Sequence, residues 1–130
     1  MLYPSMTPSR FVSDLSGIWD FAFDNGKGME EKWYEKPLTE PLSMPVPSSY
    51  NDLTESIANR EHYGWVFYQK KISVPSFVKG QRVVLRCDAV THHARIYLNG
   101  EFLATHECGF LPFEVELTEK LQPGENLLTV

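Results

Sequence analysis

Cysteine and positive charge are both scarce in this chain. Its two cysteines, Cys87 and Cys108, lie in a sequence whose start, MLYPSMTPSR, lacks the apolar run of a signal peptide, so we expect both thiols to be unpaired. Lysine and arginine number 12 against 17 aspartates and glutamates, and the net charge of −5 argues against nucleic acid or an anionic membrane as a partner. No stretch approaches the length of a membrane span, which favours a cytoplasmic protein.

Helical periodicity is also lacking. No apolar pattern with helical spacing runs beyond about three turns, and the sequence contains no repeat, heptad or low-complexity tract. The 130 residues are nevertheless 42% hydrophobic and 13% aromatic, a composition typical of a globular chain rather than a disordered one. Length and composition together indicate one domain with a sizeable core, built without long helices.

What the sequence does contain is strand-like alternation of apolar and polar residues. Asn99-Gly100, the dipeptide that best tolerates the positive φ angles of a type I′ turn, predicts a hairpin near the centre of the strongest such region. The expected strands span residues 18–24, 64–74, 82–89, 94–99, 101–105, 113–117 and 126–130. Many short strands at a spacing near ten residues, with turn residues between them, predict an all-β fold of the sandwich type.

The remaining segments are expected to be irregular. Residues 1–13 are expected to form an irregular leader that lies across the domain. Glu30–Leu38 is expected to contain at most one short helical turn. Four prolines between Pro37 and Pro47 rule out a central strand or a helix there and predict a surface crossing with Met44 and Val46 tucked in. Residues 48–63 predict a polar loop, in which Asn51-Asp52 could cap a short helix. The residues assigned to the core outright are Trp19, Phe21, Phe23 and Phe67.

The histidines and acidic residues do not form a recognisable catalytic or metal-binding pattern. His92 and His93 are adjacent, so on a strand they point to opposite faces, and His62 and His106 lie far away without ligand spacing. We therefore predict neither a metal nor a cofactor. Glycoside hydrolysis would need a pair of carboxyl groups, but most acidic residues alternate with apolar ones or sit in turns, as Glu116 does on an outward strand face. No residue of this chain is predicted to be catalytic.

Exposed aromatic rings are the usual route to sugar binding, because a ring face stacks on the apolar face of a pyranose. The candidates are Trp33, Tyr34, Tyr50, Tyr63 and Phe110. For any single one of them, packing in the core or at an interface is the favoured interpretation.

Short motifs in register along nearly the whole chain resemble the N-terminal domain of β-glucuronidases, in family 2 of the glycoside hydrolases. They are Leu15-x-Gly17-x-Trp19-x-Phe21, Val46-Pro47-x-Ser49-x-Asn51-Asp52, Gly64-Trp65-Val66-Phe67-Tyr68-Gln69, Gly80-Gln81-Arg82-Val83-Val84-Leu85-Arg86, Asp88-Ala89-Val90-Thr91-His92, Leu98-Asn99-Gly100, Gly109-x-x-Pro112-Phe113-Glu114 and Gly124-Glu125-Asn126. Most are turn and core signatures shared across the family, and the runs at 47–52 and 88–92 tilt towards glucuronidase.

The resemblance implies a jelly-roll-like β-sandwich of the galactose-binding-domain-like kind, called the sugar-binding domain. Residues 1–130 would form this domain, incomplete in its last strands, and the immunoglobulin-like domain and TIM barrel of the parent would lie outside them. The barrel would supply both catalytic glutamates for a retaining hydrolysis of β-D-glucuronides. The fragment alone would be inactive, its partners would be the other parent domains and, indirectly, the carbohydrate, and the parent would be a homo-oligomer.

Two residues are expected to come near the substrate in the parent, namely His62 and Tyr63 in the loop before the long strand. Three alternatives stay open at this point. The chain could be a free-standing carbohydrate-binding module, a scaffold sandwich without a ligand, or part of a family 2 enzyme with another specificity, such as a β-galactosidase. An incomplete last strand would leave a neighbour with unpaired backbone groups, so the isolated fragment is expected to dimerise through that edge or to lose stability.

Overall fold

A computed structural model describes residues 4–49, 64–75, 78, 80–90, 92–107 and 111–130. The elements within these ranges are eight strands and one short 3-10 helix. In chain order they are β1 (Gly17–Phe23), η1 (Trp33–Glu35), β2 (Leu42–Val46), β3 (Val66–Val74), β4 (Val84–Cys87), β5 (His93–Leu98), β6 (Glu101–Glu107), β7 (Phe113–Glu116) and β8 (Gly124–Thr129). The expected all-β class is confirmed, and η1 is the short helical turn expected within Glu30–Leu38.

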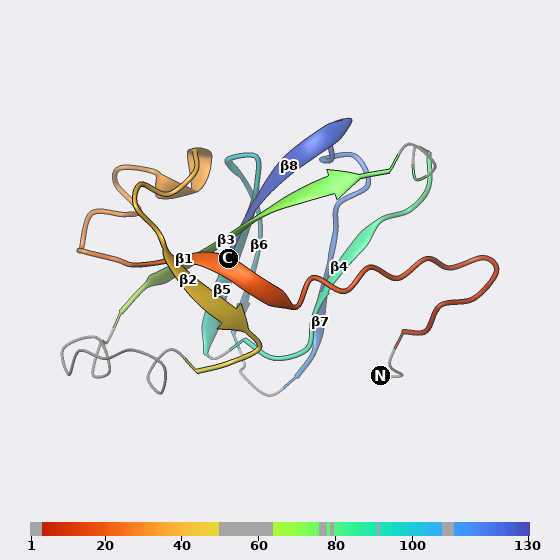
Figure 1. Ribbon diagram of the computed structural model, residues 1–130, viewed down its shortest axis with the longest axis horizontal. Coiled ribbons are helices and arrows are strands. Elements are labelled where there is room, and N and C mark those ends of the chain that lie inside the picture. Colours follow the sequence, from red (N-terminus) through yellow and green to blue (C-terminus); the bar gives the residue numbers. More distant parts are fainter. Residues whose placement is uncertain (1–3, 50–63, 76–77, 79, 91, 108–110) are drawn as a thin grey trace.

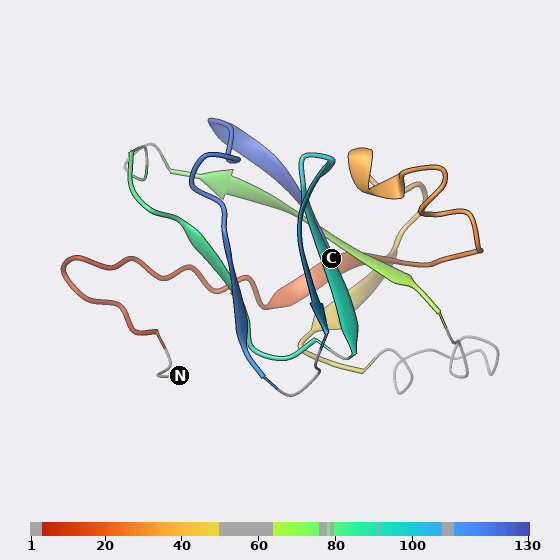
Figure 2. The ribbon, with the colours of Figure 1, turned by 180° about the vertical axis from the view of Figure 1, so that it is seen from behind.

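The strands form two antiparallel sheets that face each other. Six strands make the larger sheet in the order β2-β1-β3-β8-β5-β6, and β4 pairs with β7 in the smaller one. The smaller sheet lies across one face of the larger one, with η1 on the side of the first strands (Figure 1, Figure 2). The core between the sheets contains Trp19, Leu85, Ala94, Ile96, Leu98, Phe113, Val115, Leu117 and Leu128. The predicted sandwich is confirmed.

The alternation read from the sequence matches the buried faces of the strands. Phe113 and Val115 of β7 are buried, whereas Glu114 and Glu116 between and after them are exposed. In β1, Trp19 and Phe21 are buried, as expected of core residues, while Phe23 is half-buried. Phe67 is also buried, but it packs on the opposite face of the larger sheet, 5.4 Å from the ring of Trp33. Most of the core is therefore made of side chains from alternate strand positions, which point to the same face of their sheet.

The Asn99-Gly100 turn has the predicted conformation. Asn99 has a φ of 51° and Gly100 a φ of 83°, so both central residues adopt the left-handed conformation of a type I′ turn. The turn joins β5 to β6, and Leu98 pairs with Glu101 directly across it. A β-carbon placed on Gly100 would lie 3.2 Å from the Cα of Glu35, so the helical turn η1 packs closely against the hairpin.

Gly100→Ala is expected to lower the free energy of unfolding through both of these features. The left-handed backbone alone costs a non-glycine residue about 1 kcal/mol, and the close approach of the Glu35 backbone adds several tenths of a kcal/mol or more. Gly26→Ala is the matched control, since Gly26 has a φ of 88° but no atom within 4 Å of the position that an alanine methyl group would take. Urea unfolding of both variants checks this, and equal losses of stability would show that η1 does not press on the turn.

The proline-rich segment is more regular than the sequence predicts. Instead of a surface crossing, residues 42–46 form β2, which pairs with β1 at the edge of the larger sheet. An edge position explains how Pro45 is tolerated, because a missing N–H on the outer side of an edge strand breaks no ladder bond. The exclusion of a central strand is confirmed, and Met44 is buried and Val46 half-buried as expected.

Most strand boundaries also differ from the prediction by one or two residues, and β4, for example, spans Val84–Cys87 rather than 82–89. The long strand begins at Val66 rather than Gly64, and the last one begins at Gly124 rather than Asn126. This last strand, β8, lies between β3 and β5 inside the sheet. The expected loop at 50–63 and its possible helix lie outside the described residues.

Candidate functional site

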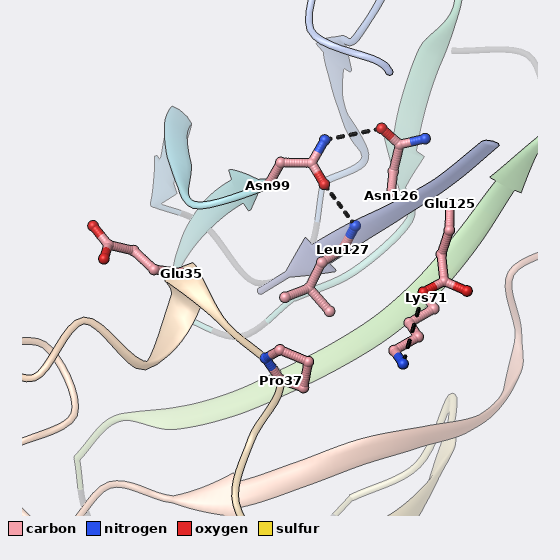
Figure 3. Close-up of a pocket in the computed structure, with 7 residues that line it drawn as sticks. All are labelled: Glu35, Pro37, Lys71, Asn99, Glu125, Asn126 and Leu127. Carbon is pink, nitrogen blue, oxygen red and sulfur yellow. Dashed lines mark hydrogen bonds and ion pairs between the residues drawn. The ribbon is translucent and has the colours of Figure 1, made fainter. Parts of the chain in front are cut away.

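A shallow pocket lies where η1, the β5–β6 turn, β3 and β8 come together (Figure 3). Its volume is about 280 Å³, close to the lower end of the range for small-molecule sites. The lining residues are Glu35, Pro37, Lys71, Asn99, Glu125, Asn126 and Leu127. Four segments that are distant in sequence therefore meet at one polar depression on the outer face of the larger sheet.

The two asparagines of the pocket are occupied by structural hydrogen bonds. Asn99 Nδ2 donates to Asn126 Oδ1 at 2.9 Å, and the backbone N–H of Leu127 donates to Asn99 Oδ1 at 2.9 Å (Figure 3). Asn126 is almost fully buried. These amides hold the hairpin turn against β8, so their first role is to position the fold rather than to bind a ligand.

The charged groups of the pocket are surface ion pairs. Lys71 Nζ lies 3.7 Å from Glu125 Oε1, and Lys32 Nζ lies 3.7 Å from Glu35 Oε1, with more than half of each side chain exposed. Such exposed pairs are worth little energetically. Both carboxylates of the pocket thus belong to solvated pairs, and no aromatic ring is among the seven lining residues. The pocket offers weak polar contacts, with neither the stacking surface of a sugar site nor a carboxyl pair set up for bond cleavage.

The aromatic residues around η1 pack on one another. Tyr34 stacks on Tyr97 with ring centroids 3.9 Å apart, and Phe102 meets Tyr97 edge-on at 5.6 Å. Tyr97 is only 6% exposed. Trp33 is tilted against Phe67 in the same layer. Phe102 stays 53% exposed, but it meets Tyr97 edge-on, so these rings do not form the flat exposed pair that a free-standing carbohydrate-binding module would use. For Trp33 and Tyr34 the packing interpretation is therefore confirmed.

A second polar and aromatic group lies on the outer face, between the start of β3 and the start of β5. The guanidinium of Arg95 lies 4.8 Å from the ring centroid of Trp65, and the ring of His93 lies 5.2 Å from it. The hydroxyl of Thr105 donates to the carbonyl of Ala94, so His93 Nε2 donates to that hydroxyl, at 2.8 Å. This group joins side chains across β3 and β5.

The expected substrate-proximal residues, His62 and Tyr63, lie outside the described residues, as do Tyr50, Cys108 and Phe110. Of the other histidines, His92 and His93 are exposed, whereas His106 stacks on Phe113 at 4.2 Å and its Nε2 is buried. Within the described ranges, no group of three or more His, Cys, Asp or Glu side chains is placed to hold a metal ion. None of the helical segments described has the length and apolar character needed to cross a bilayer.

Cys87 is a free thiol at the end of β4, which confirms the unpaired state expected of it. Burial, with a smaller contribution from the charge of Asp88, raises the pKa of the Cys87 thiol to about 11. The thiolate is the reactive form of cysteine, and at neutral pH this side chain is therefore protonated. It serves as a small core residue rather than as a nucleophile.

Buried polar side chains are the feature that sequence reasoning missed. Gln69 and Asn126 are each 1% exposed. Gln69 donates to the carbonyls of Trp33 and Lys36 and accepts from the N–H of Leu38, which ties the segment around η1 to β3. The available signal was a glutamine on the same face of the long strand as Phe67, since a buried amide needs several partners close by.

Comparison with known proteins shows which family the chain belongs to. Residues 12–130 match the family model described as "Glycosyl hydrolases family 2, sugar binding domain". The chain is 45% identical to a β-glucuronidase of Paenibacillus borealis, over all of this chain and 22% of that protein. It is 38% identical to the β-glucuronidase of Homo sapiens, over 95% of this chain and 21% of that protein. The chain thus spans about a fifth of the length of these curated relatives.

Solved structures agree with this match. A β-glucuronidase from an uncultured Clostridium sp. superposes with a TM-score of 0.95 at 53% identity, covering 99% of this chain and 23% of that one. The β-glucuronidase of Bifidobacterium dentium, solved with coumarin-3-O-glucuronide, gives a TM-score of 0.88 at 50% identity, over 99% of this chain and 21% of that one. With a family model matched along nearly its whole length, the chain belongs to the sugar-binding domain family of the family 2 glycosyl hydrolases.

Proposed function

We propose that this chain is the N-terminal domain of a β-glucuronidase that hydrolyses β-D-glucuronides. The observation that carries the proposal is the agreement of the bacterial and mammalian relatives named above, each a β-glucuronidase, which match 95% or more of the chain at 38–53% identity. The chain corresponds to only about a fifth of each relative, so the chemistry belongs to other parts of the protein.

In this proposal the domain braces a catalytic barrel and forms part of one wall of its pocket. An immunoglobulin-like domain and a TIM barrel complete the protein, and two glutamates of the barrel carry out a retaining double displacement. His62 and Tyr63 reach towards the substrate from the loop before β3, and the enzyme is a cytoplasmic homo-oligomer. The solvated carboxylates of the surface pocket support the assignment of catalysis to residues outside this chain.

The test is to compare the protein encoded by the full gene with residues 1–130 alone. With chromogenic substrates, the full-length protein is expected to release the dye from a β-glucuronide and much less from the matching β-galactoside, while residues 1–130 release none. Preference for the galactoside would replace the proposed specificity with another of the same family. Turnover by residues 1–130 alone would contradict the proposal that catalysis belongs to other domains of the protein.

A further inference from the structure

Asparagine is followed by glycine at two positions of the chain, Asn25-Gly26 and Asn99-Gly100. The side-chain amide of an asparagine in such a pair is open to attack, because glycine has no β-carbon to keep the following backbone nitrogen away from it. The attack releases ammonia and leaves a five-membered succinimide ring in the backbone, which water then opens. The two pairs are chemically alike, so their surroundings decide how fast each one reacts.

The first pair lies in the turn that follows β1. Asn25, Gly26 and Lys27 are all exposed, and no atom lies within 4 Å of the position that a β-carbon on Gly26 would take. Water therefore reaches the Asn25 amide, and the surrounding chain leaves room for the two residues to move as the ring closes.

Hydrogen bonds hold the reacting groups of this pair close together. The N–H of Lys27 donates to Asn25 Oδ1 at 3.0 Å, and the ring of atoms that this bond closes contains both Asn25 Cγ and the Gly26 nitrogen. The same bond points a donor at the oxygen that gains negative charge during the attack. The N–H of Gly26 donates to Asp24 Oδ1 at 3.0 Å, so a carboxylate lies beside the proton that must leave. The turn therefore favours attack of the Gly26 nitrogen on Asn25 Cγ.

The second pair is held in the opposite way. Asn99 Oδ1 accepts from the N–H of Leu127 and Asn99 Nδ2 donates to Asn126 Oδ1, each at 2.9 Å (Figure 3). These bonds direct the Asn99 side chain towards β8, and they occupy both ends of its amide. Gly100 is also confined, since the backbone of Glu35 lies close to it. Asn99 must break two hydrogen bonds before its Cγ can meet the Gly100 nitrogen.

We propose that Asn25 is a site of spontaneous deamidation in the folded protein, and that Asn99 is protected from the same reaction until the fold opens. The Gly26 nitrogen forms a bond to Asn25 Cγ and gives up its proton. The bond from Cγ to the side-chain nitrogen breaks, and that nitrogen takes up a proton and leaves as ammonia. One water molecule then opens the succinimide at either carbonyl, which leaves aspartate or isoaspartate at position 25. Nothing is oxidised or reduced, and water is the only other reactant.

Both products alter the turn at a place where it packs tightly. Each adds a negative charge next to Asp24, whose Oδ1 accepts from the N–H groups of Gly26 and Gly28 at 3.0 and 2.8 Å. Isoaspartate also adds one carbon to the backbone. A β-carbon on Gly28 would lie 2.6 Å from the ring of Phe67, so the turn has little room to shift there. The reaction at Asn25 therefore weakens the contact of this turn with the outer face of the larger sheet.

Trypsin separates the two sites without any substitution. Cleavage after lysine and arginine places Asn25 in the peptide 11–27 and Asn99 in the peptide 96–120, and neither peptide contains another asparagine. The full-length protein is incubated at mildly alkaline pH, either folded or unfolded in urea, and the deamidated fraction of each peptide is followed by mass spectrometry. A sample that is not incubated gives the background that digestion adds to both peptides.

In the folded protein we expect Asn25 to react about thirtyfold faster than Asn99, since Asn99 must first break two hydrogen bonds. In urea the two rates should agree within about twofold, because neither side chain is then held by the fold. Equal rates in the folded protein would overturn the proposal, and so would a rate at Asn25 that unfolding raises more than about tenfold. Neither result depends on the substrate that the full-length enzyme prefers, so the test is independent of the proposed function.

Discussion

Replacing Gln69 by leucine is expected to lower the free energy of unfolding by about 3 kcal/mol. The leucine has a similar volume, so the loss comes from hydrogen bonding rather than from a cavity. The carbonyls of Trp33 and Lys36 and the N–H of Leu38 would lose their partner, and each such group costs about 1 kcal/mol or more when it stays shielded from water. Urea unfolding followed by circular dichroism measures the total.

The same substitution should loosen one particular segment. Residues 33–38 are held to β3 by the Gln69 amide, so exchange of the Leu38 amide should accelerate before the sheet itself opens. Lys71→Leu is the matched control, because Lys71 lies two residues further on the same face of β3 but is exposed. Its effect should stay within about 0.5 kcal/mol. A loss below about 1 kcal/mol for Gln69→Leu would mean that aromatic packing alone holds η1.

Replacing Asn126 by leucine should cost about 2 kcal/mol or somewhat more. This side chain accepts from the Gln122 N–H at 2.8 Å and from Asn99 Nδ2 at 2.9 Å, and it donates to the carbonyls of Gln122 and Gly124. It therefore closes the turn before β8 and joins that turn to the β5–β6 hairpin. The expected loss is smaller than for Gln69 because water can reach part of the exposed Gln122 and Gly124 backbone.

The control for Asn126 is Asn25→Leu, which removes an exposed asparagine with one hydrogen bond, from the N–H of Lys27. It should cost less than half as much. A double-mutant cycle with Asn99→Ala then separates the link to the hairpin from the closure of the turn. Additive effects of Asn99→Ala and Asn126→Leu would show that the two asparagines act independently, against the network drawn in Figure 3.

The sequence-based predictions succeed where a local pattern determines the structure. The alternation in Phe113–Glu116 predicts which side chains are buried, and the Asn99-Gly100 pair predicts the turn, because each signal lies within a few residues. The edge strand β2 was missed because its stability comes from pairing with β1, a separate segment earlier in the chain, and not from its own residues. Secondary structure made by pairing with a distant partner leaves little local signal.

The contacts of the buried polar side chains were harder to predict for a related reason. From the sequence alone, a glutamine or an asparagine in a strand is expected to face solvent. Only the fold shows that Gln69 lies under η1 and that Asn126 faces the turn before β8.

The place of β8 in the sheet has a consequence for how the chain is made. Among the described strands, β8 alone joins β2-β1-β3 to β5-β6, and it is the last of them in sequence. A ribosome adds about 5–20 residues per second, so the two halves wait for several seconds with the edges of β3 and β5 open to other nascent chains. The larger sheet closes only when this final strand leaves the exit tunnel, which makes its completion a late and non-local folding event.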